Sequence, residues 1–484
     1  MDHFDTAQAG AVLAAVGVSL ALLAGARVSL LAGFALTAVG EALLARAGGG
    51  LALSPKVVGA GALALAVAVG ATVVLARRPT LVLPLLVAAA PFRLPLSIDT
   101  HHRFLVAVAE RGQLGRLLPL YGVLAVAALE LCWRTARRPA VTQIPRSLAV
   151  PAAAFLALSC LSLLWSSAES SGRTLLTFFL VPFGVLVAVG ARAAFAPWLP
   201  RVLAIETVAL AALFATVGIV EAATHRLLFF SPGLEISNAY SSYFRVTSLF
   251  RDPSLYGRHV VVGLAVVLVA LFMRKLTLGW ATALIALLWA GLFFSYSQSS
   301  LVALFVVVFA VTAIAGDLLA RRTMAAVALI ATLGAVALLA ASVVSASTQR
   351  ATSDRSRRVE LTARVFAHHP IAGVGIGAQP HATQLVSPRP GPPEKFVSHT
   401  TPLTVGAELG ILGVLLYLAL LWGASRVLYQ TWRVRPALGL ALVAVVLALF
   451  VHSLFYSGFF EDPITWLAVA IAANVVGRLR VERA

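Results

Sequence analysis

The chain has 484 residues, of which 60% are hydrophobic and 12% are charged, and its formal net charge is +18. Soluble globular proteins carry about 25% charged residues, and disordered chains have low hydrophobicity, so the composition excludes both classes. The sequence therefore predicts a membrane protein with many spans. Its two cysteines, Cys132 and Cys160, lie in or beside apolar runs, which excludes a disulfide framework.

Apolar runs long enough to cross a bilayer follow one another along most of the chain. A bilayer core of about 30 Å requires roughly 20 mostly apolar helical residues. The first such run begins after Asp2 and Asp5. A signal peptide would begin with positive charge, so we interpret this run as a helix. Charge-free runs occur at 6–26, 57–76, 147–168, 174–191, 323–349 and 436–460. Weaker spans, which hold or flank an ionisable residue, are predicted at 28–45, 79–92, 114–132, 202–222, 257–273, 403–425 and 463–477.

The stretch 276–316 is long enough for two helices, which the polar hexad Ser295–Ser300 would separate. The predicted fold is therefore an all-α, polytopic transmembrane bundle of about 12–15 spans with a long, partly helical outer loop. We divide the chain into four regions. They are N-terminal transmembrane helices at 1–200, transmembrane helices with an outer loop at 223–256 within 201–343, a long outer loop at 344–402, and C-terminal transmembrane helices at 403–484.

The placement of basic residues predicts the orientation in the membrane. If the long loop at 344–402 lies outside, nearly every short loop on the opposite side is basic, as at Arg77–Arg78 and Arg274–Lys275. Cytoplasmic loops carry such an excess of Lys and Arg. Further arginines then remain outside, in the loop 223–256 and in the long loop. Long loops cross regardless of charge, but the grouping favours an anionic ligand, because guanidinium groups match phosphate oxygens.

Several kinds of chemistry have no motif in the chain. No Walker-type phosphate loop occurs, which disfavours ATP-driven transport. The outer loops lack paired acids of the kind that hold a metal, so we predict neither a metal nor another cofactor. We expect membrane lipids as partners and no nucleic acid.

The most distinctive stretch is His368–Gly377, which contains His-His-Pro followed by Gly-Val-Gly-Ile-Gly. Its glycines indicate a tight backbone whose N–H groups could face an anion, or a turn that ends a helix from Arg355 to Ala367; both could hold. Downstream, His399 precedes the predicted helix that carries Glu408. Imidazole is suited to accept a proton from a sugar hydroxyl, although a histidine at a membrane boundary is often only a polar tip.

Three segments, taken in order, resemble signatures of bacterial O-antigen ligases and the related O-antigen polymerases. The first is the turn Arg245–Ser254, and the second is the hexad Ser295–Ser300. The third is an amphipathic outer helix followed by His-Pro, the glycine-rich run, Ser398–His399 and the Glu408–Gly410 turn. The ordered set spans 244–413, whereas the first 200 residues carry no motif of this kind.

The resemblance implies a metal-independent glycosyltransferase at the outer face of the bacterial inner membrane. Its donor would be a glycan on undecaprenyl pyrophosphate, and its acceptor would be a hydroxyl of a glycan or lipid. Carried over by motif, His399 becomes the general base and Arg245 a pyrophosphate ligand. Further predicted pyrophosphate ligands are Arg251, Arg258, Gln298, Arg355, Arg357 and Arg358. Other candidate site residues are His368, His369 and Glu408.

One position departs from the family. The family commonly has an arginine where this chain has Gln298, so either Arg251 or Arg258 substitutes for it or the donor is held differently. Two alternatives stay open: a polymerase that joins lipid-linked repeat units, and a transporter or flippase for an anionic lipid. A transporter would use ionisable residues within the membrane, for which the candidates are Glu41, Glu130, Glu206 and Glu221.

Overall fold

The computed structural model describes residues 3–48, 55–92, 117–137, 141–228, 232–250, 252–323, 325–327, 355–387, 398, 400–456, 458 and 460–483. Within these ranges the secondary structure is helical and no strand occurs. In the described part of the chain, eleven helices are long and apolar enough to span a membrane, or twelve if a bent pair counts as one span. The all-α, polytopic bundle predicted from the sequence is confirmed. The predicted span at 323–349 lies mostly outside the described residues.

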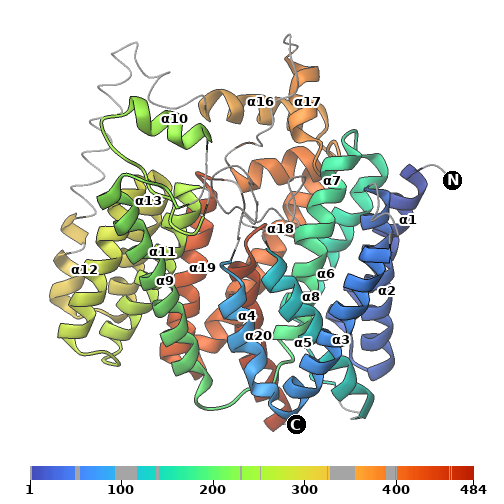
Figure 1. Cartoon of the computed structure of the whole chain (residues 1–484), viewed down its shortest axis with the longest axis horizontal. Coiled ribbons are helices and arrows are strands. Elements are labelled where there is room, and N and C mark those ends of the chain that lie inside the picture. Colours follow the sequence, from blue (N-terminus) through green and yellow to red (C-terminus); the bar gives the residue numbers. More distant parts are fainter. Residues whose placement is uncertain are drawn as a thin grey trace.

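The helices run up and down between two ends of the molecule (Figure 1). In the N-terminal half they are α1 (His3–Leu23), α2 (Arg27–Ala47), α3 (Pro55–Arg77), η1 (Pro79–Leu81), α4 (Val82–Ala89), α5 (Leu118–Arg137), α6 (Arg146–Leu161), η3 (Ser162–Trp165), α7 (Glu169–Leu175), η4 (Leu176–Leu180), α8 (Val181–Gly190) and α9 (Leu199–Thr224). The others are α10 (Pro232–Tyr240), α11 (Pro253–Phe272), α12 (Leu278–Ser295), α13 (Gln298–Ala315), α16 (Arg355–His368), α17 (Gln379–Val386), α18 (Thr401–Val434), α19 (Pro436–Ser453) and α20 (Pro463–Arg483).

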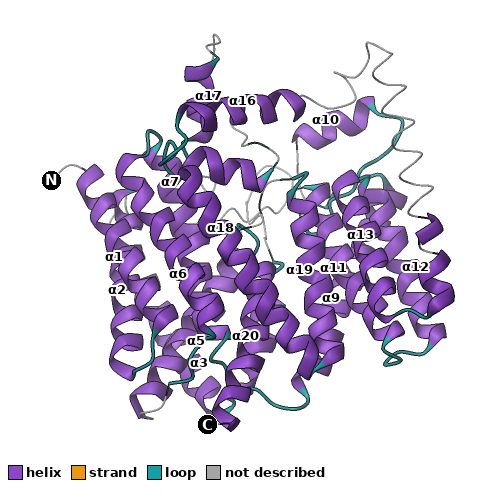
Figure 2. Cartoon of the chain, turned by 180° about the vertical axis from the view of Figure 1, so that it is seen from behind, coloured by secondary structure: helices purple, strands orange, loops and turns teal. Residues whose placement is uncertain are grey.

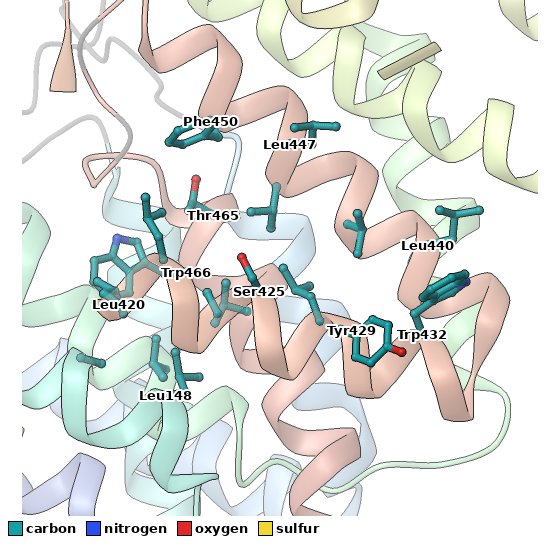
Figure 3. A pocket seen from close by; sticks show the side chains of 18 of the residues that line it. Leu148, Leu420, Ser425, Tyr429, Trp432, Leu440, Leu447, Phe450, Thr465 and Trp466 are labelled. Atoms are coloured by element: carbon teal, nitrogen blue, oxygen red, sulfur yellow. The ribbon is translucent and has the colours of Figure 1, made fainter. Parts of the chain in front are cut away.

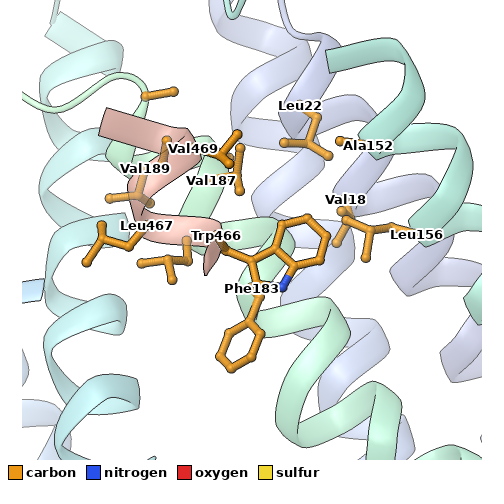
Figure 4. Close-up of a cluster of buried hydrophobic side chains, with 14 of the residues drawn as sticks. Val18, Leu22, Ala152, Leu156, Phe183, Val187, Val189, Trp466, Leu467 and Val469 are labelled. Atoms are coloured by element: carbon orange, nitrogen blue, oxygen red, sulfur yellow. The ribbon is translucent and has the colours of Figure 1, made fainter. Parts of the chain in front are cut away.

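Two apolar cores hold the spans together. One is built mainly by α1, α5, α6, α8, α18 and α20, and the other by α9, α11, α12, α13 and α19. Figure 4 shows part of the first core, where Trp466 of α20 lies among Leu22, Leu156 and Phe183. Small residues allow α1 and α2 to approach closely, because a Cβ added at Gly17 would lie 2.4 Å from the backbone of Thr37.

Two spans differ from the sequence prediction. The segment 79–92 does not form a separate straight span, because α4 is short and is bent by 108° from α3 at the break before Pro79. Helix α18 is longer than predicted and contains a break at Gly410, whose φ of 66° and ψ of −164° are not helical. The break before Pro79 has a local cause, because a proline disfavours helical backbone at the residue before it. The break at Gly410 depends instead on a tertiary contact that is described below.

The C terminus lies at one end of the molecule (Figure 1). Arg192 is buried and donates to the carbonyls of Thr142 (2.9 Å), Ala188 (3.1 Å) and Ala24 (3.3 Å). Burial lowers the pKa of its guanidinium to about 10, which leaves the group charged at neutral pH. Helices α10, α16 and α17 lie at the opposite end (Figure 2).

Candidate active site

The polar hexad separates α12 from α13, as the sequence predicted, at the end of the molecule where α10 and α16 lie. Ser297 is the N-cap of α13, and its hydroxyl lies 2.8 Å from that of Ser300 and 3.2 Å from that of Ser299. Gln298 is exposed at the first position of α13. The four serines are buried, so Gln298 and the partly exposed Tyr296 are the hexad side chains that can meet a ligand.

Arg245 is held against this hexad by its side chain and its backbone. Asn238 of α10 accepts from the Arg245 N–H and donates to the Arg245 carbonyl, each at 3.0 Å. The Arg245 Nε donates to the carbonyl of Ser295 at 3.4 Å, and the next N–H, of Val246, donates to Phe294. The first two signatures are therefore joined in space, with a half-buried guanidinium at the end of α12.

The turn after Arg245 is fixed by two carboxylates, of which Glu221 is buried. Glu221, at the end of α9, accepts backbone N–H groups from Thr247 (2.8 Å), Ser248 (2.7 Å) and Leu228 (2.6 Å). Ser248 needs this support because its φ is 52°, a region that residues other than glycine seldom adopt. Asp252 then caps α11 by accepting from the N–H groups of Ser254 and Leu255. These contacts give Glu221 a local role in shaping the loop. Arg251 lies outside the described residues.

Arg258 forms a buried ion pair. It belongs to α11, and its Nη2 lies 2.6 Å from Oδ2 of Asp462, with side-chain exposures of 4% and 1%. Asp462 also accepts the Ile464 N–H and so begins α20. The pair joins a helix of one apolar core to a helix of the other. It also balances the Arg258 charge within the protein.

A histidine that the sequence analysis did not select lies beside this pair. His452 of α19 is buried, and its Nε2 lies 3.1 Å from the hydroxyl of Ser299. It therefore ties α19 to the hexad. The available signal was a histidine inside an otherwise charge-free span, since polar residues at such places mark functional or packing sites. Asp462 was visible only as a neighbour of Glu461, and its pairing with Arg258 depends on tertiary structure.

The glycine-rich run is a structural junction. Gly373, Gly375 and Gly377 have φ values of 66°, 88° and 74°, which glycine adopts readily. The N–H groups of Val374 and Gly375 donate to the carbonyls of Ala407 and Glu408. Those of Gly377 and Gln379 donate to the Glu408 carboxylate. These backbone N–H groups thus face a carboxyl group of the protein itself.

The junction also explains the break in α18. The Ile411 N–H donates to the carbonyl of Pro370 at 2.8 Å, and a Cβ on Gly410 would lie 2.1 Å from the Ile371 carbonyl oxygen. On the other side, the Ile376 N–H donates to Ser162, and the Ser166 hydroxyl donates to the Ile376 carbonyl. Ser162 and Ser166 therefore hold the third signature in place, although the first 200 residues carry no recognised motif.

The long loop is helical in part, as predicted. Helix α16 matches the expected helix and ends at His368. On it Arg357 and Arg358 are half-buried, whereas His368 and His369 are exposed. The side chain of Arg355 and the whole of His399 lie outside the described residues. Ser398, which precedes His399, is buried and lies 2.8 Å from the Thr404 hydroxyl of α18.

Two cavities lie within the bundle. A groove of about 480 Å³ is lined by apolar side chains of α6, α18, α19 and α20, among them Leu420, Trp432 and Phe450 (Figure 3). A smaller cavity of about 80 Å³ is lined by Ser159, Thr401, Glu408 and Glu461 among others. Phe460 lines both. Among the described residues, no group of three or more His, Cys, Asp and Glu side chains could hold a metal ion.

The fold and this site define a multi-pass helical membrane protein in which Arg245 lies against the serine-rich hexad between α12 and α13. Within it, residues 263–418, about a third of the chain, match the family model described as O-antigen ligase. The match supports a glycosyl-transferring enzyme of the ligase or polymerase type. It covers the hexad, the glycine-rich run and the start of α18, and it leaves out Arg245 and Arg258. No curated protein matches the chain.

Proposed function

We propose that this protein transfers a glycan from undecaprenyl pyrophosphate to an acceptor hydroxyl at the outer face of the inner membrane, without a metal. The observation that carries the proposal is the Arg245 guanidinium, held at the end of α12 beside the hexad of the matched family segment. The basic short loops that the sequence places opposite the long loop favour an outward-facing site. A lipid-linked donor would reach it from the bilayer.

The proposed reaction forms one bond and breaks another at the anomeric carbon. His399 takes the proton of the acceptor hydroxyl, whose oxygen attacks that carbon. The bond between the carbon and the pyrophosphate oxygen breaks, and its electron pair leaves with the pyrophosphate. Fixed cations in a site of low water content stabilise such developing charge. Arg245 would supply one such cation, and its two-pronged geometry suits phosphate oxygens.

The other candidates receive different parts in this proposal. The charge of Arg258 is balanced by Asp462, so we assign it to positioning α11 and α20 around the donor. Gln298 is exposed at the start of α13 and can hydrogen-bond a phosphate oxygen. Arg357 and Arg358 lie on α16 at the same end of the molecule and would contact the pyrophosphate from there. Arg251 and Arg355 stay candidates from the sequence alone.

The test of the proposed function is transfer by the purified protein, incubated with lipid-linked oligosaccharide and a candidate acceptor. We expect a glycosylated acceptor and released undecaprenyl pyrophosphate. A single shifted product would assign the ligase reaction, and a ladder of lengths would assign the polymerase reaction. If neither product forms while the labelled lipid crosses proteoliposome membranes, the proposal is wrong and the protein is a flippase.

Arg245→Ala should reduce kcat/KM for the lipid-linked donor by roughly 10- to 100-fold. This range corresponds to the loss of a charge-assisted hydrogen bond of about 1.5–3 kcal/mol. Arg245→Lys should restore only part of the activity, because an ammonium group lacks the forked geometry. Arg226→Ala is the matched control, since Arg226 is exposed at the same end of the molecule. Equal activity of the Arg245 and Arg226 variants would remove Arg245 from the donor site.

A further inference from the structure

Two tyrosines form a pair beside the arginine that we assign to the pyrophosphate. The rings of Tyr243 and Tyr296 lie with centroids 4.5 Å apart and an angle of 34° between their planes. Tyr243 comes from the loop after α10 and Tyr296 from the end of α12. Tyr243 is 45% exposed, and Tyr296 is partly exposed. The pair therefore presents aromatic surface outside the apolar cores.

The backbone at Tyr296 is held in an unfavourable conformation. Its φ is 48° and its ψ is 33°, and it caps α12 in the left-handed region that favours glycine. The conformation is fixed because the Tyr296 N–H donates to the Phe293 carbonyl and the next N–H, of Ser297, donates to the Ser295 hydroxyl. Strain of this kind, held by surrounding contacts, is typical of ligand sites. Here it places an aromatic ring where glycine would be free of strain.

Both tyrosines are close in sequence to the contact between Arg245 and Ser295. Tyr243 precedes Arg245 by two residues, and the Arg245 Nε donates to Ser295, the residue before Tyr296. In a glycan linked through pyrophosphate, the first sugar is bonded directly to a phosphate oxygen. A pyrophosphate on Arg245 would therefore bring that sugar next to the tyrosines.

We propose that Tyr243 and Tyr296 form a stacking platform for the pyranose ring that is attached to the pyrophosphate. The proposal rests on the proposed function and adds the part of the site that contacts sugar. The C–H groups on one face of a pyranose carry a slight positive charge, and the face of an aromatic ring is negative, so the two surfaces attract. The phenol hydroxyls can reach hydroxyls at the edge of the sugar. Binding to the platform requires a pyranose ring and discriminates little between one sugar and another.

The experiment compares two lipids on the full-length protein in nanodiscs. The first is undecaprenyl pyrophosphate, and the second is the same carrier with one N-acetylglucosamine. We expect the wild-type protein to bind the glycosylated lipid more tightly. Tyr243→Ala and Tyr296→Ala should weaken binding of the glycosylated lipid by roughly threefold to tenfold and leave binding of the bare carrier unchanged. Tyr243→Phe should retain most of the effect, because it keeps the ring.

The controls separate this platform from an aromatic belt at the membrane surface, where tyrosines also gather. Tyr240→Ala removes a neighbouring tyrosine that is 90% exposed, and it should change neither affinity. Tyr296→Gly should be more thermally stable than Tyr296→Ala, because glycine removes the strain, yet both should lose the sugar-dependent affinity. If the tyrosine variants lose affinity for both lipids equally, or for neither, the platform is wrong. The assignment of Arg245 to the pyrophosphate would still stand. If the wild-type protein binds neither lipid, the proposed function fails as well.

Discussion

Asp462→Ala should destabilise the protein by about 3–5 kcal/mol, because it leaves the buried guanidinium of Arg258 without its counter-charge. In a membrane protein of ordinary stability, a loss of that size should lower the thermal unfolding temperature in detergent by many degrees and reduce accumulation. The measurement is thermal unfolding followed by fluorescence of the purified protein. The apolar double variant Arg258→Met with Asp462→Leu should recover much of the stability, since it removes both charges together.

A surface ion pair provides the matched control. Arg364 and Glu360 lie one turn apart on α16, with exposures of 57% and 60%. Exposed pairs contribute about 0–1 kcal/mol, so Glu360→Gln should leave the unfolding temperature almost unchanged. The double variant also tests function: if it folds and is inactive, Arg258 contributes to the site beyond stability. If Asp462→Ala were as stable as Glu360→Gln, the packing of the two apolar cores against each other would not depend on the ion pair.

The local elements of the fold were predictable because each depends on nearby sequence. The hexad interrupts an apolar stretch with hydroxyls that cap a helix, and α12 and α13 end and begin there. The amphipathic pattern before His368 gave α16. In contrast, Gly410 lies within a run of helical hydropathy, and its break exists because the Pro370 carbonyl replaces a helical hydrogen-bond partner.

The candidate site was predictable only where a signature is continuous in sequence. Arg245 and the hexad were selected, and the structure brings them together. The partner of Arg258 is about two hundred residues away, and Glu221 reads as one more acid at the end of a span. The composition of the glycine-rich run predicted its sharp turns. The carboxyl group that accepts hydrogen bonds from its backbone belongs to Glu408, which lies on another element. Such pairings depend on the packing of helices that are distant along the chain.

His399→Ala should abolish glycan transfer while the protein inserts and accumulates normally. A general base contributes about 10²- to 10⁴-fold to the rate, so the turnover number should fall by at least the lower value. His399 lies between Ser398, which is bonded to α18, and Thr400, the N-cap of that helix. Removing an imidazole there should not disturb these contacts. The measurement is single-turnover transfer with saturating lipid-linked donor.

The matched controls are His368→Ala and His369→Ala, which alter exposed imidazoles of the same long loop. Both should retain most of the wild-type turnover number. The binding of undecaprenyl pyrophosphate distinguishes the base from the donor contact: His399→Ala should bind it as the wild-type protein does, whereas Arg245→Ala should not. Retained transfer in His399→Ala would remove the histidine from the mechanism and direct attention to the other hydrogen-bonding groups at this end, beginning with Glu461 and His452. An attack by the acceptor oxygen still requires that some group take its proton.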